Sequence, residues 1–131
     1  MVIGIIGGGA SGMAAALFAA QNPNIQVLLF ERQARVGRKL LATGNGRCNL
    51  SNLNVKSGFH GNAPEFADPA IAGFGPEATL EWFRSLGLVT VCEPSGRVYP
   101  YSDQANSVVD VLRFALNQPN IQVYTAFEVE R

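Results

Sequence analysis

The sequence predicts an α/β fold with a parallel sheet, and three observations lead to this prediction. A short apolar run rich in β-branched residues, Val2–Ile6, predicts a buried strand. A helical pattern of Ala, Leu and Met follows over Met13–Gln21, and Ile25–Phe30 predicts a second buried strand. The peptide Pro-Asn-Ile-Gln-Val stands at 23–27 and again at 119–123, each time between a helix and a strand, which predicts a third parallel strand. Strands that alternate with helices are typical of a parallel α/β sheet.

The turn between the first strand and the first helix carries a ligand-binding pattern. Residues 7–12 read Gly-Gly-Gly-Ala-Ser-Gly and satisfy G-x-G-x-x-G. Gly7 permits the tight turn, Gly9 lets the backbone approach a pyrophosphate, and Gly12 lets the helix lie close to the strand. Glu31 ends the second strand, where a carboxylate can accept hydrogen bonds from a ribose diol. A glycine-rich turn without a ligand is the alternative, but the flanking strands and the acid favour a Rossmann-like dinucleotide site.

Two segments after the second strand admit two interpretations each. Residues 32–39 are basic and polar with one glycine, and form either a solvated loop or a source of cations for the same ligand's phosphates. Residues 40–52 contain glycines and asparagines, which supply positive φ angles and free amide donors. Such a loop either wraps the edge of a planar polar ligand or only connects two elements.

The remainder of the chain predicts an insertion in the nucleotide-binding unit. We expect residues 1–52 to form the first βαβ unit with its loop, 53–104 the insertion, and 105–131 the return helix and strand. The elements expected in the last two parts are a short helix near Pro64–Ile71, a helix from Pro76 to Gly87, a hairpin of Leu88–Glu93 with Arg97–Tyr99, a helix capped by Ser102 or Asp103, and a strand over Ile121–Thr125.

The composition limits the classes of function. The chain has 131 residues, of which 47% are hydrophobic and 15% charged, as expected for one globular domain. The formal net charge is zero, which argues against general binding to nucleic acid or to anionic membranes. Cys48 and Cys92 form no C-x-x-C pair, and with a single histidine, His60, they give no metal-ligand spacing. Residues 1–20 lack a basic n-region and are interrupted by glycines, so we expect a cytoplasmic protein without a membrane span.

Three stretches together resemble one group of bacterial flavoproteins. They are residues 7–12, residues 37–52 (GRKLLATGNGRCNLSN) and residues 96–100 (GRVYP). The group is the NAD(P)/FAD-dependent oxidoreductases of the aminoacetone oxidase and 3-dehydro-bile-acid reductase type. The middle stretch is the specific one, and the similarity covers essentially the whole chain. Members of the group are much longer, so this chain is similar to their N-terminal part, and we expect it to have little activity by itself.

The resemblance implies FAD as the cofactor, NAD(P)H as a further expectation for the electron donor, and a small organic substrate. It implies a role for each of the following residues. The pyrophosphate would be held by Gly7, Gly9, Ala10, Ser11 and Gly12, and the phosphate end by Arg32, Arg38 and Lys39. The adenosine ribose would be held by Glu31, and the adenine by the backbone of Val129. The flavin end would be held by Thr43, Gly44, Asn45, Gly46 and Asn49.

Two other functions stay open at this level. A nicotinamide-dependent dehydrogenase domain would share the glycine turn and Glu31, although it does not need the loop of residues 37–52. A non-catalytic dinucleotide-binding module, or part of an RNA-modifying flavoprotein, is the third candidate, against which the neutral charge argues. No catalytic acid or base is identified; Cys48 lacks a second cysteine nearby, which favours a packing role. An exposed sheet edge would also favour self-association, which light scattering would detect.

Overall fold

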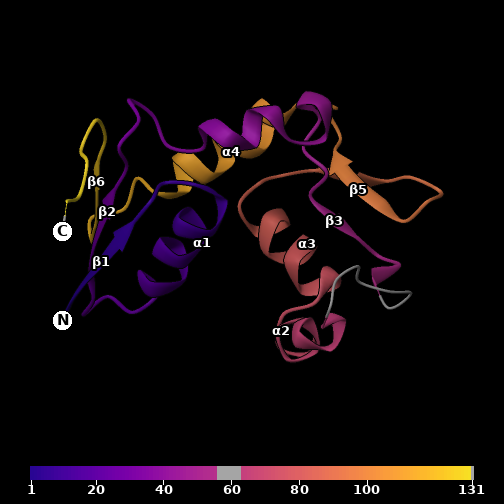
Figure 1. The fold of residues 1–131 in the computed structure, drawn as a ribbon, viewed down its shortest axis with the longest axis horizontal. Coiled ribbons are helices and arrows are strands. Elements are labelled where there is room, and N and C mark those ends of the chain that lie inside the picture. Colours follow the sequence, from indigo (N-terminus) through magenta and orange to yellow (C-terminus); the bar gives the residue numbers. More distant parts are fainter. Residues whose placement is uncertain (56–62, 131) are drawn as a thin grey trace.

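The computed structural model describes residues 1–55 and 63–130. The described part contains two three-stranded sheets with helices beside and between them (Figure 1). The elements in chain order are β1 (Val2–Ile6), α1 (Ala10–Ala19), β2 (Gln26–Phe30), the 3-10 segment η1 (Arg38–Gly46), β3 (Ser51–Asn52), the 3-10 turn η3 (Pro64–Ala67), α2 (Asp68–Gly73), α3 (Pro76–Ser85), β4 (Thr90–Cys92), β5 (Arg97–Pro100), α4 (Ala105–Ala115) and β6 (Ile121–Tyr124).

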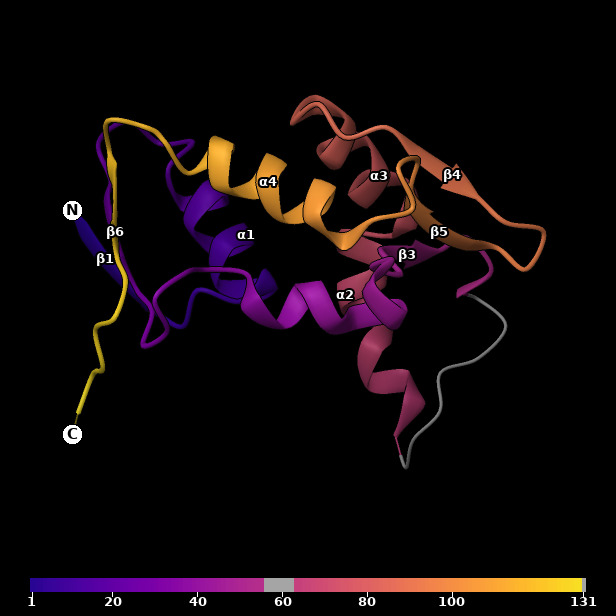
Figure 2. The same cartoon turned by 90° about the horizontal axis from the view of Figure 1, so that it is seen from above.

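The first sheet is parallel and has the order β1-β2-β6. Ile3 lies opposite Val27, and Val27 lies opposite Ile121, so all three strands run in one direction. The predicted α/β class and the third parallel strand are therefore confirmed. Helices α1 and α4 lie on the same side of this sheet (Figure 2). Val27 and Leu29 point toward these helices and are fully buried, as alternation along a strand with one covered face requires.

The main hydrophobic core forms where the two helices meet the parallel sheet. Met13 and Ala16 of α1, Val27 of β2 and Val108 of α4 are fully shielded from solvent. No polar or charged side chain is buried among the described residues. Burial of apolar surface is thus the main stabilising contribution at this contact.

The repeated Pro-Asn-Ile-Gln-Val peptide forms two adjacent junctions in space. The Asn120 side-chain amide donates to the carbonyl oxygen of Ala20 at 2.9 Å and to that of Ile25 at 3.1 Å. The amide of Val27 donates in turn to the carbonyl of Asn120 at 2.8 Å. The second junction therefore provides hydrogen bonds to the first, which fixes β6 beside β2.

The second sheet is antiparallel, with the order β3-β5-β4. The β4–β5 hairpin agrees with the prediction from the sequence. Strand β3 begins at Ser51, two positions before the expected start of the insertion at residue 53, and that boundary stays a prediction. Phe18 of α1 stacks on Trp82 of α3 with ring centroids 5.3 Å apart, so aromatic packing joins the two parts of the chain.

Two of the predicted helix starts are wrong, and a third predicted helix is present. Helix α1 begins at Ala10 rather than Met13, because the extended backbone of Gly9 already serves as its N-cap. Neither Ser102 nor Asp103 is the N-cap of α4; Gln104 is, because Asp103 has a φ of +57° and turns the chain before the helix. The short helix expected near Pro64 is present as η3 followed by α2.

His60 lies outside the described residues. Among the residues that the structure describes, no group of three or more His, Cys, Asp or Glu side chains could hold a metal ion. No helix in the described ranges is long and apolar enough to cross a membrane.

The two faces of α4 allow a matched test of the core. Leu112 is 2% exposed and Phe114 is 78% exposed on the same helix. We expect Leu112→Ala to lower the free energy of unfolding by about 3 kcal/mol, because it removes buried methyl groups and leaves a cavity. Phe114→Ala should change it by less than about 0.5 kcal/mol. Urea unfolding followed by circular dichroism measures both, and equal losses would contradict this assignment of the core.

Candidate dinucleotide-binding site

The glycine turn connects β1 to α1 with very little space between the two elements. Gly7 has a φ of +100°, a conformation that favours glycine. A Cβ atom on Gly12 would lie 1.8 Å from the carbonyl oxygen of Gly7, so any side chain there would force the helix away from the strand. The Gly7 amide donates to the carbonyl of Phe30 at 2.7 Å, which connects the turn to β2.

The N-terminus of α1 has the features of an anion-binding helix end. Its N-cap, Gly9, makes no side-chain capping bond, and its first turn contains no acidic residue. The backbone bonds of the helix start with the amide of Met13, which donates to the carbonyl of Gly9 at 2.9 Å. A Cβ on Gly9 would meet no atom within 4 Å, so this side of the turn is open. A pyrophosphate fits here, because the amides of the first turn and the positive end of the helix dipole favour an anion.

Glu31 follows β2 and is hydrogen-bonded to the glycine turn. Its Oε2 accepts a hydrogen bond from the Gly8 amide at 2.7 Å, and its Oε1 accepts one from the Gln33 amide at 2.7 Å. The carboxylate is only partly buried. Each carboxylate oxygen offers two lone pairs, so both keep capacity for the hydroxyl groups of a ribose. The structure thus brings Glu31 and the turn together, as a dinucleotide site requires.

The basic segment after Glu31 returns to the same turn. The Gly37 amide donates to the carbonyl of Gly8 at 2.7 Å, which places the start of η1 against the glycines. Arg38 donates to the side-chain oxygen of Gln33 at 2.7 Å, and Arg32 and Lys39 are exposed. Within the described ranges, these three cations make no ion pair with a carboxylate. Their positive charge is therefore available to a phosphate near the turn.

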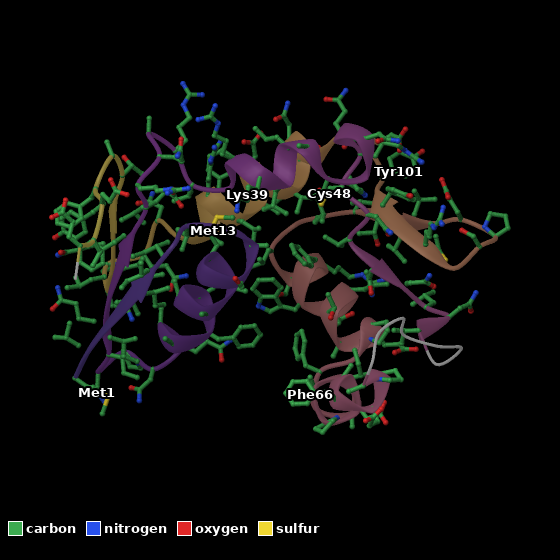
Figure 3. All side chains as sticks on the ribbon, viewed as in Figure 1. Met1, Met13, Lys39, Cys48, Phe66 and Tyr101 are labelled. Atoms are coloured by element: carbon green, nitrogen blue, oxygen red, sulfur yellow. The ribbon has the colours of Figure 1, made fainter. Side chains whose placement is uncertain are left out.

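The loop Thr43–Asn49 lies at the other end of η1, beside the second sheet rather than at the glycine turn. Figure 3 labels Lys39 near the start of η1 and Cys48 beyond its end, on the side of the second sheet. Gly44, Asn45, Gly46 and Cys48 all have positive φ angles, between 54° and 83°. The Cys48 thiol is buried, at 3% exposure, whereas Asn45 and Asn49 are exposed. The loop presents polar side chains and backbone to solvent, and Cys48 packs beneath them.

Val129 lies in the irregular segment that follows β6 and is 42% exposed. The amide of Phe127 donates to the carbonyl of Glu31 at 3.0 Å, and that of Ala126 donates to the carbonyl of Gln33 at 2.8 Å. These bonds bring the segment containing Val129 to the same edge of the sheet as Glu31. A contact of its backbone with an adenine stays a prediction.

Arg47 has a structural role that the sequence analysis did not single out. Its guanidinium donates to Glu93 at 2.8 Å and to Asp103 at 2.5 Å, and it lies 3.9 Å from the ring centroid of Tyr99. The hydrogen bonds to Glu93 and then to Asp103 raise the pKa of Arg47 above its usual range. The partners stand 46 and 56 positions away along the chain. The only signal in the sequence is the position of Arg47 inside the glycine- and asparagine-rich stretch.

A surface cavity of about 320 Å³ lies elsewhere, between α4 and β6. Arg113, one of its lining residues, donates to the carbonyl oxygen of Val36 at 2.7 Å. None of the predicted cofactor contacts lines this cavity. Its lining residues are Val36, Arg113, Leu116, Asn117, Ile121 and Val123.

Gly12 and Gly9 offer a matched pair of substitutions in the turn. We expect Gly12→Ala to lower the free energy of unfolding by about 3 kcal/mol or more, because the new methyl group collides with the backbone oxygen of Gly7. Gly9→Ala should cost less than about 1 kcal/mol, because its Cβ meets open space and only the preference for the N-cap changes. Thermal and urea unfolding measure both effects, and a costly Gly9→Ala would argue against an open site.

Comparison with known proteins identifies the family. Residues 1–131 match the model of the HI0933-like protein Rossmann domain. The chain is 48% identical over 130 residues to the 3-dehydro-bile acid delta(4,6)-reductase of Clostridium scindens, covering 98% of this chain and 32% of the relative. It is 32% identical over 126 residues to the ribosomal RNA dihydrouridine synthase of Escherichia coli, covering 95% of this chain and 31% of that relative. The chain thus spans about a third of the length of these curated relatives.

A solved structure supports the same fold. The crystal structure of Thermovibrio ammonificans THI4 superposes with a TM-score of 0.59 and 17% identity, covering 95% of this chain and 37% of that chain. At this identity the likeness concerns the fold alone. The glycine turn, the parallel sheet and the match along the whole chain agree with the resemblance seen in the sequence, and the chain belongs to the HI0933-like family as a Rossmann domain.

Proposed function

We propose that this chain is the FAD-binding portion of a flavin-dependent oxidoreductase. The observation that carries the proposal is the hydrogen bond between the Gly8 amide and Glu31, which places a ribose-binding carboxylate beside an uncapped helix N-terminus. Membership of the HI0933-like family and the 48% identity to a protein named as a reductase support it. Because the chain spans about a third of that relative, the reaction and substrate of the whole protein belong to the proposal.

Different residues of the chain are assigned to the ADP end and to the flavin end of the cofactor. In this proposal the amides at Gly9–Gly12 hold the pyrophosphate and Glu31 holds the ribose of the ADP half. The exposed cations Arg32, Arg38 and Lys39 compensate the phosphate charge. The backbone near Val129 accommodates the adenine. The loop Thr43–Asn49 meets the flavin end, for which its exposed amides and asparagines offer hydrogen bonds.

The chemistry at the site comes from the cofactor. A bound flavin supplies hydride or electron transfer. The residues of this chain bind and orient the cofactor, and none of them is assigned a proton-transfer role. We propose a small organic substrate and NAD(P)H as electron donor, residues 53–104 as an insertion, and little activity of this chain by itself. Both described cysteines are free, in keeping with a reducing cytoplasm.

A nicotinamide-dependent dehydrogenase domain is the less favoured reading of the same turn. Its cofactor would use the glycines and Glu31 in the same way. A dehydrogenase domain would have no use for the loop of residues 43–49, where two residues other than glycine, Asn45 and Cys48, adopt costly positive φ angles. FAD, whose flavin end extends beyond the ADP half, gives that loop a function.

Titration of the chain with FAD, ADP and NADH by calorimetry tests the proposal. We expect FAD and ADP to bind, and Glu31→Ala to weaken both by about tenfold or more, because a charge-assisted hydrogen bond to the ribose is lost. Glu65→Ala, which removes an exposed carboxylate from η3, is the control and should change neither affinity. Circular dichroism confirms that each variant is folded. Tighter binding of NADH than of FAD would overturn the assignment.

Action on RNA is a second candidate function. It is favoured by the identity of 32% to a ribosomal RNA dihydrouridine synthase and by the exposed cations Arg32, Arg35, Arg38 and Lys39. The net charge of zero and the small-molecule name of the 48% identical relative favour the first candidate.

Binding to a ribosomal RNA fragment over a range of salt concentrations separates the two candidates. Action on RNA predicts an affinity that falls steeply with salt, with a log–log slope that decreases by about one for each cation replaced by alanine. Our first candidate predicts no more binding than a neutral control protein shows. A steep slope that is unchanged in Arg32→Ala and Lys39→Ala would exclude this surface as the RNA contact.

A further inference from the structure

The loop Thr43–Asn49 has a backbone conformation that needs outside support. Asn45 and Cys48 adopt positive φ angles of 55° and 59°, which L-residues rarely do without compensation. Within the loop, the Cys48 amide donates to the carbonyl of Thr43 at 3.0 Å, and the Arg47 amide donates to that of Gly44 at 3.1 Å. A Cβ on Gly44 would lie 2.7 Å from the Asn49 amide nitrogen, so the loop is tightly folded on itself.

Arg47 connects this loop to the second part of the chain through three contacts. Its Nη2 donates to Glu93 Oε1 at 2.8 Å, its Nε donates to Asp103 Oδ1 at 2.5 Å, and its guanidinium lies over the Tyr99 ring at 3.9 Å. A planar guanidinium can make two directed hydrogen bonds and stack on a ring at once, which an ammonium group cannot. The side chain is about one third exposed, at 37%, so hydrogen-bond geometry rather than buried charge defines its position.

All three partners come from the region after residue 53. Glu93 and Tyr99 belong to the β4–β5 hairpin, and Asp103 precedes α4. Cys48, next to Arg47, and Tyr101, after β5, lie at the same end of the molecule (Figure 3). The chain after the loop also pairs with β5, through the Leu50 amide and the carbonyl of Val98 at 2.8 Å. The β4–β5 hairpin therefore contacts the loop Thr43–Asn49 and supports its conformation.

We infer that Arg47 is a positioning residue, which holds the loop Thr43–Asn49 in the conformation that receives the flavin end of FAD. The inference rests on the proposed function. Arg47 acts through the loop and is not assigned a contact with the cofactor. In this arrangement the segment 53–104 supports the cofactor site rather than forming a separate spacer. The ADP end, built on Gly7–Gly12 and Glu31, does not depend on Arg47.

Comparison of FAD with ADP separates positioning of the loop from general stability. For Arg47→Met we expect the affinity for FAD to fall about tenfold while the affinity for ADP changes less than about twofold. The shift that binding causes in the flavin absorption bands should decrease with it. Arg47→Lys keeps the positive charge but not the planar guanidinium with its two directed hydrogen bonds, and should bind FAD more tightly than Arg47→Met but less tightly than the unchanged chain. Arg84→Met, which breaks an exposed ion pair with Glu81 on α3, is the matched control and should change neither ligand.

Each outcome decides between the two claims. Equal losses for FAD and ADP, or no loss for either, would overturn the positioning role and leave the proposed function in place. Absence of FAD and ADP binding by the folded wild-type chain would overturn the proposed function and this inference with it. If Arg47→Met does not fold, Glu93→Gln, which preserves the shape of the contact, is expected to reduce FAD affinity selectively, and an unchanged FAD affinity would overturn the positioning role.

Discussion

The close contact of α1 with β1 is the constraint on which the candidate site depends. The distance of 1.8 Å from a Cβ on Gly12 to the Gly7 oxygen leaves room for a hydrogen atom only. Because the helix lies so close, its N-terminus emerges at the end of the strand, where the open side of Gly9 faces solvent. The same contact buries Met13 and Ala16 against the sheet. The stability of this contact and the geometry of the candidate anion site thus depend on one steric condition.

Glu31 connects the glycine turn to the two neighbouring strands, β2 and β6. Its carboxylate accepts hydrogen bonds from the backbone amides of Gly8 and Gln33. The backbone amide of Glu31 donates to the carbonyl of Tyr124 at 2.8 Å. Three segments from different parts of the chain therefore converge at one end of the parallel sheet. This carboxylate is a structural acceptor, and because it is only partly buried, its remaining lone pairs give it the capacity to bind a ligand hydroxyl as well.

The second part of the chain is joined to the first by two kinds of contact. Aromatic packing of Phe18 against Trp82 and Phe74 holds α1 to the segment that contains α2 and α3. Charged and cation–π contacts of Arg47 hold the end of η1 to the β4–β5 hairpin. Apolar contacts set the position of α2 and α3 relative to α1, and directional contacts set the conformation of one loop.

The sequence by itself determined the local elements and the ADP end of the candidate site. Apolar runs predicted the first two strands of the parallel sheet, and the repeated Pro-Asn-Ile-Gln-Val peptide predicted the third. The spacing of Gly7, Gly9, Gly12 and Glu31 predicted a dinucleotide site formed by the turn and the acid. The signals for the first two strands and for the turn are short in range, because they depend on the residues of one βαβ unit. The first residues of α1 and α4 were harder to predict, because Gly9 and Gln104 act as N-caps through backbone conformation rather than through a typical capping side chain.

Only the tertiary structure decided how the loop Thr43–Asn49 is held and which residues support it. Arg47 finds Glu93 and Asp103 across 46 and 56 positions, and no local pattern relates them. Their meeting depends on the pairing of β5 with β3 and on the packing of α4 against η1. Such contacts arise from the summed packing of distant elements. The sequence therefore determined which residues could bind a dinucleotide, whereas the fold decided which residues hold the loop Thr43–Asn49 in place.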